Sequence, residues 1–336
     1  MPEFNVGDNM IYIFPILLAF MVVEFLVARH DYELKDSLAG FGIAAGAALI
    51  SFFTKAFTVV VIFQGVFNFF EPLRAEYLGY ATIGWAWWAW VLAILADDFN
   101  FYWHHRWSHT VRLLWAAHVP HHSSKNFNLA VSIRNGWFIT LYKPIFWLWM
   151  AAVGFEPIMI GSALIINATY QYFLHTKLIG SLGFFGKIFN NPHVHAVHHS
   201  SNIQYLDKNH GGILLIWDHL FGTWQNTIKD VKPHYGILKS PDTYNPIKLN
   251  THIFVDIFND VRKAKSFKEA FMYIFGPPGW SPDNSSLTAK QIQELYYAGK
   301  ISADMQFEGV SLEKELNSIK EERESSDNKE SSEKAA

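Results

Sequence analysis

The residues of this sequence best suited to chemistry are histidines in three closely spaced groups. They are His105 and His109, then His118, His121 and His122, then His195, His198 and His199. Residues three or four apart share one face of a helix, so each group can aim two or three imidazoles at one point. The spacing HxxHH occurs twice, whereas 16 histidines in 336 residues would produce it about 0.04 times by chance. The groups therefore predict metal binding.

The remaining histidines do not share this spacing. On a helix His104 is turned by about 100° from His105, so we expect that it does not bind metal. For His210 the sequence leaves both interpretations open. The isolated His30, His234 and His252 are expected to be structural or solvated.

The ligand types restrict the metal. Eight or nine imidazoles are too many for one ion, so two ions are implied. The chain has no cysteine, which excludes disulfides and thiolate sites, and the HExxH pattern of zinc proteases is absent. Imidazole suits iron, copper, zinc and nickel alike. Iron with O2 is favoured because the histidines follow apolar segments where acyl chains would arrive, while a zinc hydrolase and a di-copper centre stay open.

Those apolar segments predict a membrane protein. Half of the residues are hydrophobic and 17 % are aromatic, and a bilayer crossing needs about 20 mostly apolar residues. Candidate segments are 10–28, read as a retained anchor, 37–70, 81–96, 137–153 and 158–174. The segment 37–70 is too long for one helix and somewhat short for two full crossings, so a bent or re-entrant hairpin around Lys55 is considered. The glycine and proline between 153 and 158 predict a helical hairpin, which would place its two ends on the same side of the membrane.

The sequence divides into three parts. Residues 1–80 are expected to be N-terminal membrane helices, 81–285 a catalytic domain with the histidine groups, and 286–336 a polar, partly disordered extension. The net charge of −3 and the absence of a basic run give no reason to expect nucleic acid as a partner.

The order HxxxH, HxxHH, HxxHH beside a membrane hairpin resembles the fatty acid hydroxylase / sterol desaturase superfamily. The stretches 101–106, 115–124 and 207–223 look closest to its alkylglycerol monooxygenase branch. The resemblance implies an all-α integral membrane protein with several passes. In it, a transmembrane helical bundle carries a cytosol-facing, histidine-rich helical cap that holds a dinuclear metal site.

Carried over position by position, the resemblance also implies the ligand set. It consists of His105, His109, His118, His121, His122, His175, His195, His198 and His199. Residues expected to orient these ligands, as carboxylates and carbonyls usually do, are Asp98, Gln171, Asp207 and Asp218. No catalytic residue beyond the metal ligands is expected.

The implied function is a membrane-bound di-iron oxygenase. It would use two iron ions, O2 and external electrons to hydroxylate a lipid, to desaturate it, or to cleave its ether bond. No glycine-rich turn for NAD(P)H or flavin is recognisable, so we expect a donor protein, or a diffusible reductant such as a reduced pterin. Thr110 stands where the animal ether-cleaving enzymes carry a glutamate, which leaves the reaction and the substrate open. The alternatives are a membrane zinc hydrolase and a non-enzymatic metal carrier.

Overall fold

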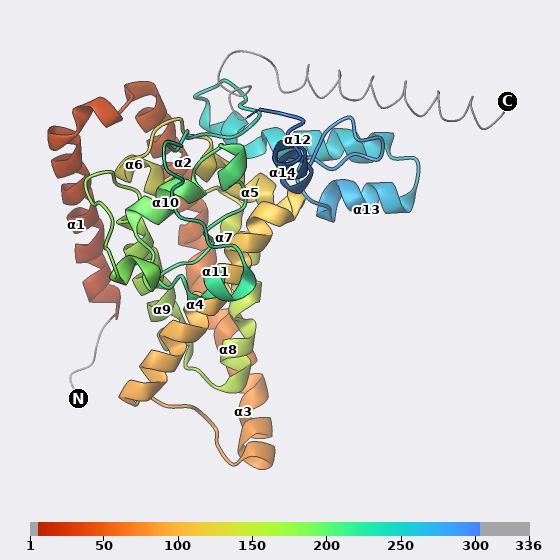
Figure 1. The fold of residues 1–336 in the computed structure, drawn as a ribbon. Coiled ribbons are helices and arrows are strands. Elements are labelled where there is room, and N and C mark those ends of the chain that lie inside the picture. The colour runs from red at the N-terminus through yellow and green to blue at the C-terminus, as the bar shows by residue number, and fades with distance from the viewer. Residues whose placement is uncertain (1–5, 303–336) are drawn as a thin grey trace.

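Helices account for the regular structure of the protein in a computed structural model that describes residues 6–302 (Figure 1). The first half contains α1 (Val6–Val27), η1 (Arg29–Asp31), α2 (Leu34–Ala56), η2 (Phe57–Phe63), α3 (Gln64–Leu78), α4 (Trp87–Thr110), α5 (Arg112–His122), α6 (Leu129–Ser132), α7 (Ile139–Tyr142), η3 (Lys143–Trp147), α8 (Leu148–Val153) and α9 (Pro157–Tyr172). The second half contains η4 (Phe185–Lys187), α10 (Pro192–His198), η5 (Ile203–Tyr205), α11 (Ile216–Phe221), α12 (Pro246–Lys263), α13 (Phe267–Phe275) and α14 (Ala289–Tyr297). The expectation of an all-α protein is confirmed for the described residues.

The long helices form a bundle that carries the short ones at one end. Figure 1 shows α1 and α4 running toward that end, which we call the cap, while α2 and α3 run away from it. Along the bundle α3 packs on α8 and α4 packs on α9. The cap contains α5, α6 and α10, so the segments with the second and third histidine groups lie together at one end.

A single continuous helix replaces the hairpin considered for residues 37–70. The helix runs from Leu34 to Leu78, and its middle part, Phe57–Phe63, widens to a π-helix without reversing the chain. Within the described residues it is the one helix long and apolar enough to cross a membrane, and only 6 % of its most apolar stretch is buried. Two shorter apolar helices are Ile13–Val27 and Ile139–Val153.

The hairpin predicted between 137 and 174 is present. Its first arm is the irregular series α7, η3 and α8, and its second arm is α9. Gly154 ends α8 with φ +102°, a conformation that favours glycine, and Pro157 begins α9. From α3, the buried Arg74 donates to the carbonyls of Ala151 and Ala152 at the end of α8, which ties the turn to the long helix.

A hydrophobic core fills the bundle between its helices. Phe63, Phe67, Ala93, Trp147 and Met159 are among its buried members. A polar layer lies on the cap side of this core. There the carboxylate of Asp97 accepts hydrogen bonds from the Trp147 indole at 2.7 Å and from the Asn167 amide at 2.7 Å. Because a buried carboxylate must be hydrogen-bonded, these contacts fix α4 against η3 and α9.

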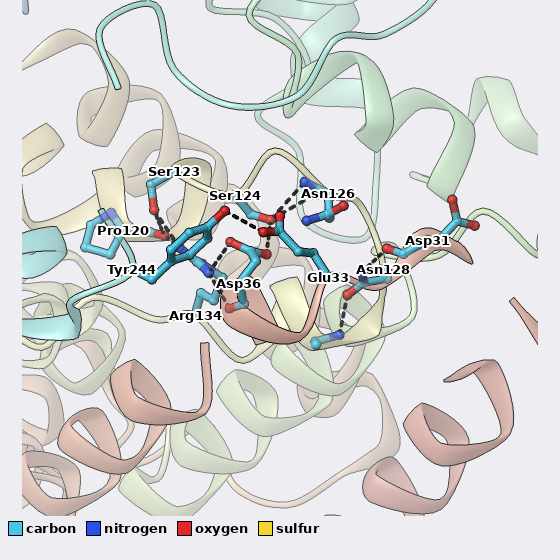
Figure 2. A network of polar contacts seen from close by, with 11 residues as sticks. Asp31, Glu33, Asp36, Pro120, Ser123, Ser124, Asn126, Asn128, Arg134 and Tyr244 are labelled. Carbon is cyan, nitrogen blue, oxygen red and sulfur yellow. Dashed lines mark hydrogen bonds and ion pairs between the residues drawn. The ribbon is translucent and has the colours of Figure 1, made fainter. Parts of the chain in front are cut away.

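Two buried carboxylates join the N-terminal helices to the cap. Glu24 of α1 accepts hydrogen bonds from the Leu129 amide at 2.7 Å and from the Thr176 hydroxyl. Asp36 of α2 accepts from the Ser124 hydroxyl at 2.6 Å and forms an ion pair with Arg134 at 2.9 Å, as Figure 2 shows. The N-terminal helices therefore hold the loop between α5 and α6 in place.

Arg134 extends this connection to the second histidine group. Its side chain is almost fully buried, and it donates to the Pro120 carbonyl at 3.2 Å and to the Ser123 hydroxyl at 2.8 Å (Figure 2). Pro120 lies inside the second group and Ser123 directly follows it. The guanidinium thus connects α2 to the end of α5, and each of its three nitrogens has a hydrogen-bond partner.

The first part of the predicted C-terminal extension packs on the cap. Ile292 and Ile301 bury against Ile203 of η5, and the Gln293 amide donates to the carbonyls of Ile203 and Leu206, each at 3.0 Å. Residues 303–336, for which the sequence predicts partial disorder, lie outside the described residues.

We expect the replacement Asp36→Asn to lower the free energy of unfolding by about 3–5 kcal/mol, because it leaves the buried Arg134 cation without its counter-charge. Denaturant unfolding in detergent, followed by intrinsic fluorescence, measures this loss. A matched control is Asp242→Asn, which breaks the exposed Lys125–Asp242 pair and should cost no more than about 1 kcal/mol. Equal losses in the two variants would contradict the role given to the buried pair.

Candidate metal centre

Nine histidines form two buried groups at the cap end of the bundle. The five-histidine group consists of His105, His109, His118, His122 and His198, and the four-histidine group of His121, His175, His195 and His199. Within each group the candidate ligand nitrogens lie within 4.8 Å of one another. The structure thus brings together all nine residues that were predicted as ligands.

Each HxxHH motif divides its histidines between the two groups. His118 and His122 of α5 enter the five-histidine group, while His121 enters the four-histidine group. The third motif does the reverse, with His195 and His199 in the four-histidine group and His198 in the other. Of the two or three imidazoles that one motif was expected to aim at one point, each HxxHH motif therefore provides two. Neighbouring residues on a helix are about 100° apart, so only the i and i+4 members point the same way.

Local sequence explains why the short α10 forms. Asn191 is its N-cap, and the Asn191 side chain accepts from the Val194 amide, while Pro192 occupies the first helical position. The helix then ends at His198, with His199 as its C-cap. The second motif also lies in a helix, because α5 continues through Pro120 to His122.

Backbone carbonyls fix the orientation of three rings. The Nδ1 atom of His175 lies 2.9 Å from the Gln171 carbonyl, that of His198 lies 2.8 Å from the Lys208 carbonyl, and that of His105 lies 3.0 Å from the His210 carbonyl. A carbonyl only accepts, so Nδ1 carries the proton in each ring. In the neutral imidazole the Nε2 atom then presents a lone pair, and for His198 this atom is buried without a hydrogen-bond partner.

Hydrogen bonds alone cannot explain the nitrogen positions in the four-histidine group. The Nε2 atoms of His175, His195 and His199 are each 3.1 Å from the other two. The Nε2 of His175 has no proton, so hydrogen bonding would require both His195 and His199 to donate to it. The Nε2 protons of His195 and His199 would then also face each other. Ligands at 2.0–2.1 Å from one ion are separated by about 2.9–3.4 Å. The geometry therefore fits a metal ion shared by these rings.

Burial keeps the histidines neutral. It lowers the pKa of His118, His121, His122, His195, His198 and His199 well below the ordinary 6.5, and nearby imidazoles lower it further. For His175 burial lowers the pKa to about 4. Neutral imidazole is the form that binds metals, so the residues fit the ions that the sequence implies.

The loop 210–214 lies between two buried carboxylates. Asp98 accepts from the amides of Ile213 and Leu214, and Asp218 accepts from those of His210 and Gly211. A Cβ on Gly212 would lie 2.7 Å from an oxygen of Asp98 and 2.9 Å from the amide oxygen of Asn167, so the buried loop needs glycine at this position. No described contact joins either carboxylate to a clustered imidazole. Both carboxylates therefore act on the site indirectly. They hold the loop whose His210 carbonyl orients the His105 ring.

The other two residues expected to orient ligands differ in how they act. An oxygen of Asp207 lies 3.7 Å from Nδ1 of His109, directly beside a clustered ring. Gln171 contacts His175 through its backbone carbonyl, while its side chain donates to Asn167. The sequence pattern found Gln171 by helical spacing but could not tell which of its atoms is used.

The remaining histidines lie outside the two groups among the described residues. His104 is buried between aromatic rings and stacks on Tyr142 with a centroid separation of 5.5 Å. His210 is buried beside His109, and its carbonyl accepts the hydrogen bond from the His105 ring. Carbonyls such as those of Lys208 and His210 are the orienting groups that the sequence analysis missed, because every residue carries one and no side-chain pattern marks it.

Comparison with known proteins finds similarity over the segment that carries the two histidine groups. The family model for fatty acid hydroxylase matches residues 90–223. The chain is 36 % identical to human alkylglycerol monooxygenase over 62 % of its length, and 31 % identical to the Xenopus tropicalis protein over 82 %. It is also 29 % identical to a Rhizobium tropici ornithine lipid hydroxylase over 44 % of its length.

These matches cover only part of the relatives. The aligned region spans 46 % of the human protein, 60 % of the Xenopus tropicalis protein and 45 % of the bacterial hydroxylase. No solved structure matches the chain significantly.

The neutral histidines make stability depend on pH. The unfolded chain binds protons at His175 below its ordinary pKa of 6.5, whereas the folded protein binds them only near pH 4. The contribution of His175 to the stability of the metal-free protein should therefore be complete above pH 6.5 and should fall by about 3 kcal/mol as the pH falls to 4. Denaturant unfolding of chelator-treated protein across this pH range measures the slope.

The variant His175→Gln should flatten this pH dependence, while His30→Gln, which changes a ring that is 82 % exposed, should leave it unchanged. If the slope were the same in the parent and in His175→Gln, the burial of a neutral imidazole would not be its cause.

Proposed function

We propose that the chain, whose residues 90–223 match the fatty acid hydroxylase family, is a membrane-bound di-iron oxygenase that oxidises a lipid. It would use O2 and electrons from an external donor. The observation that carries this proposal is the pair of buried groups, with nine imidazoles at the end of an apolar bundle.

The size and composition of the groups support iron over zinc. A structural zinc site closes with four ligands and a catalytic one keeps three protein ligands, whereas one group here offers five imidazoles. Neither group includes a carboxylate that could serve as the base of a hydrolase. Bound iron would supply the redox chemistry that activates O2 for attack on an unactivated C–H bond.

The residues of this chain have three tasks in the proposed reaction. The five-histidine group and the four-histidine group each hold one ion. The carbonyls of Gln171, Lys208 and His210 keep the rings turned so that their bare nitrogens face the ions. Buried apolar side chains beside the groups exclude water, and Phe127 is one of them, with its ring 5.5 Å from that of His199.

A lipid is the substrate class that the relatives support. One set of relatives is named for alkylglycerols and another for an ornithine lipid, and both names describe amphiphiles with long apolar chains. We propose insertion of one oxygen atom into a C–H bond of such a chain, with ether cleavage as the consequence where that carbon carries an ether oxygen. Desaturation is the remaining variant of the same chemistry.

The distribution of charges supports a multi-pass placement with the cap in the cytoplasm. At the cap end the loops and helix termini carry Arg29, Lys35, Arg112, Lys125 and Lys177, whereas the turns at the other end, 79–86 and 154–157, carry no lysine or arginine. Cytoplasmic loops of membrane proteins are enriched in these residues. We propose α1, the helix Leu34–Leu78, α4 and the α7–α9 hairpin as the membrane-embedded elements.

The same proposal covers the division of the chain and the electron supply. Residues 1–80 would form the N-terminal membrane helices, 81–285 the catalytic domain and 286–336 the extension. A cytoplasmic cap would give a donor protein, or a diffusible reductant such as a reduced pterin, access to the metals from the aqueous side.

Metal analysis tests the two-ion centre. Protein purified in detergent after iron-supplemented growth should contain about two irons per chain, and His121→Ala and His198→Ala should each lose about one, since the two residues belong to different groups. The exposed His30 provides the matched control, and His30→Ala should retain the parental iron content. Stoichiometric zinc in the parent would favour the membrane hydrolase, and absence of any metal would favour neither enzyme.

The reaction is tested by its products. Membranes that contain the protein should accumulate an oxidised lipid under O2 and not under argon, and His198→Ala should abolish this accumulation, because it removes a ligand of one of the two ions that the proposed centre requires. Mass spectrometry of lipid extracts with 18O2 would detect the incorporated atom. Retention of iron without any O2-dependent product would contradict the oxygenase and support a metal carrier.

A further inference from the structure

Helices α12 and α13 form a pair that is firmly attached to the rest of the protein. The buried Leu249, Asn250 and Ile257 lie on the inner face of α12, which packs on α5 and α2. The Asn250 side chain accepts from the Trp137 amide at 2.9 Å. From α5, Arg112 forms an ion pair with Asp260 at 2.6 Å. The position of the pair is therefore coupled to the helix that carries the second histidine motif.

The opposite face of this pair is apolar and exposed. The exposed fractions are 61 % for Phe258, 87 % for Phe267, 49 % for Phe271 and 46 % for Phe275. Phe267, Phe271 and Phe275 are spaced by four residues, so they share one face of α13. Exposed aromatic rings of this number on adjoining helices mark an interaction surface.

Cations surround these rings. Arg262, Lys263, Lys265 and Lys268 fall within seven residues that contain no acidic residue. All four side chains are exposed, and no ion pair is found for them among the described residues. The guanidinium of Arg262 lies 5.5 Å from the Phe258 ring. Aromatic rings beside unpaired lysines suit a binding partner that has an apolar interior and a negatively charged surface.

The pair lies at the level where the bundle meets the cap. Pro246, the first residue of α12, contacts α2 at Gly42, eight residues after the cap-side start of that helix and hence about 12 Å along it. Figure 1 shows α12 and α13 extending across the direction of the bundle near its cap end. In that view α13 lies below α12, on the side of the far end of the bundle. Helices at this height along the bundle, and directed across it, would run along the surface of a membrane that the bundle crosses.

We propose that α12 and α13 form an interfacial anchor that lies on the surface of the bilayer crossed by the bundle. The phenylalanines enter the headgroup region and the cations contact anionic lipid headgroups. This inference rests on the proposed membrane placement. A second copy of the chain is disfavoured as the occupant, because a two-fold contact would bring the two cation clusters against each other. Through α5, the anchor sets the height of the cap above the bilayer.

The absence of cysteine allows a direct test. A single nitroxide label is attached to the full chain at Phe271→Cys, and collisions with O2, which concentrates in lipid, are compared with collisions with a water-soluble nickel chelate. The protein is held in nanodiscs of phosphatidylcholine with phosphatidylglycerol. Reference labels are Phe52→Cys, 78 % exposed on the long apolar helix, and Lys290→Cys on α14, whose side chain is 87 % exposed.

We expect the ratio of O2 to nickel collisions at Phe271 to lie close to that at Phe52 and well above that at Lys290. Adding Lys265→Glu and Lys268→Glu to the Phe271 label should lower the ratio in anionic nanodiscs. A Phe271 ratio equal to that of Lys290 would overturn the inference while Phe52 still reports lipid. Protection of Phe271 from both reagents would overturn it in favour of a protein partner. A water-exposed Phe52 would show instead that the membrane placement itself has failed.

Discussion

The burial of nine imidazoles in a small volume is the constraint on which the rest of this structure depends. Three rings have their Nδ1 protons committed to backbone carbonyls, so the Nε2 atom of each presents a lone pair to the other imidazoles of its own group. Such an arrangement is unfavourable unless a cation shares the lone pairs, because the nitrogens repel and cannot all be hydrogen-bonded. The fold must therefore hold the rings in place from outside, and each segment that carries them has a buried polar contact that does so.

These supporting contacts come from distant parts of the chain. Glu24 and Asp36 belong to the first two helices, yet they fix the loop after α5 and the segment beside His175. Asp98 and Asp218 hold the loop 210–214 from opposite sides. Because each carboxylate is satisfied by two or more donors, the apolar helices and the cap depend on one another. The N-terminal helices are thus part of the support of the site as well as of its attachment to the bundle.

Much of this architecture could be predicted from local patterns. The histidine spacing identified the nine residues of the two groups, partly through the family resemblance, and the Gly154–Pro157 turn located the hairpin. The continuous helix Leu34–Leu78 could not be distinguished from a hairpin, because a π-helical segment leaves no clear signature in composition. The contacts of Asp98 and Asp218 were also unpredictable, since the amides that they bind belong to a loop folded back by tertiary packing.

The sequence by itself determined the ligand chemistry. Without cysteine, only imidazole, carboxylate, amide or water could hold a metal, and the spacing of three and four residues required helices to present the rings. Only the tertiary structure decided how the rings are shared, since α5 and α10 each give an i, i+4 pair to one group and the intervening histidine to the other. The physical reason is that helical periodicity fixes the angle between neighbouring side chains, whereas the point at which side chains from different helices meet depends on how those helices pack.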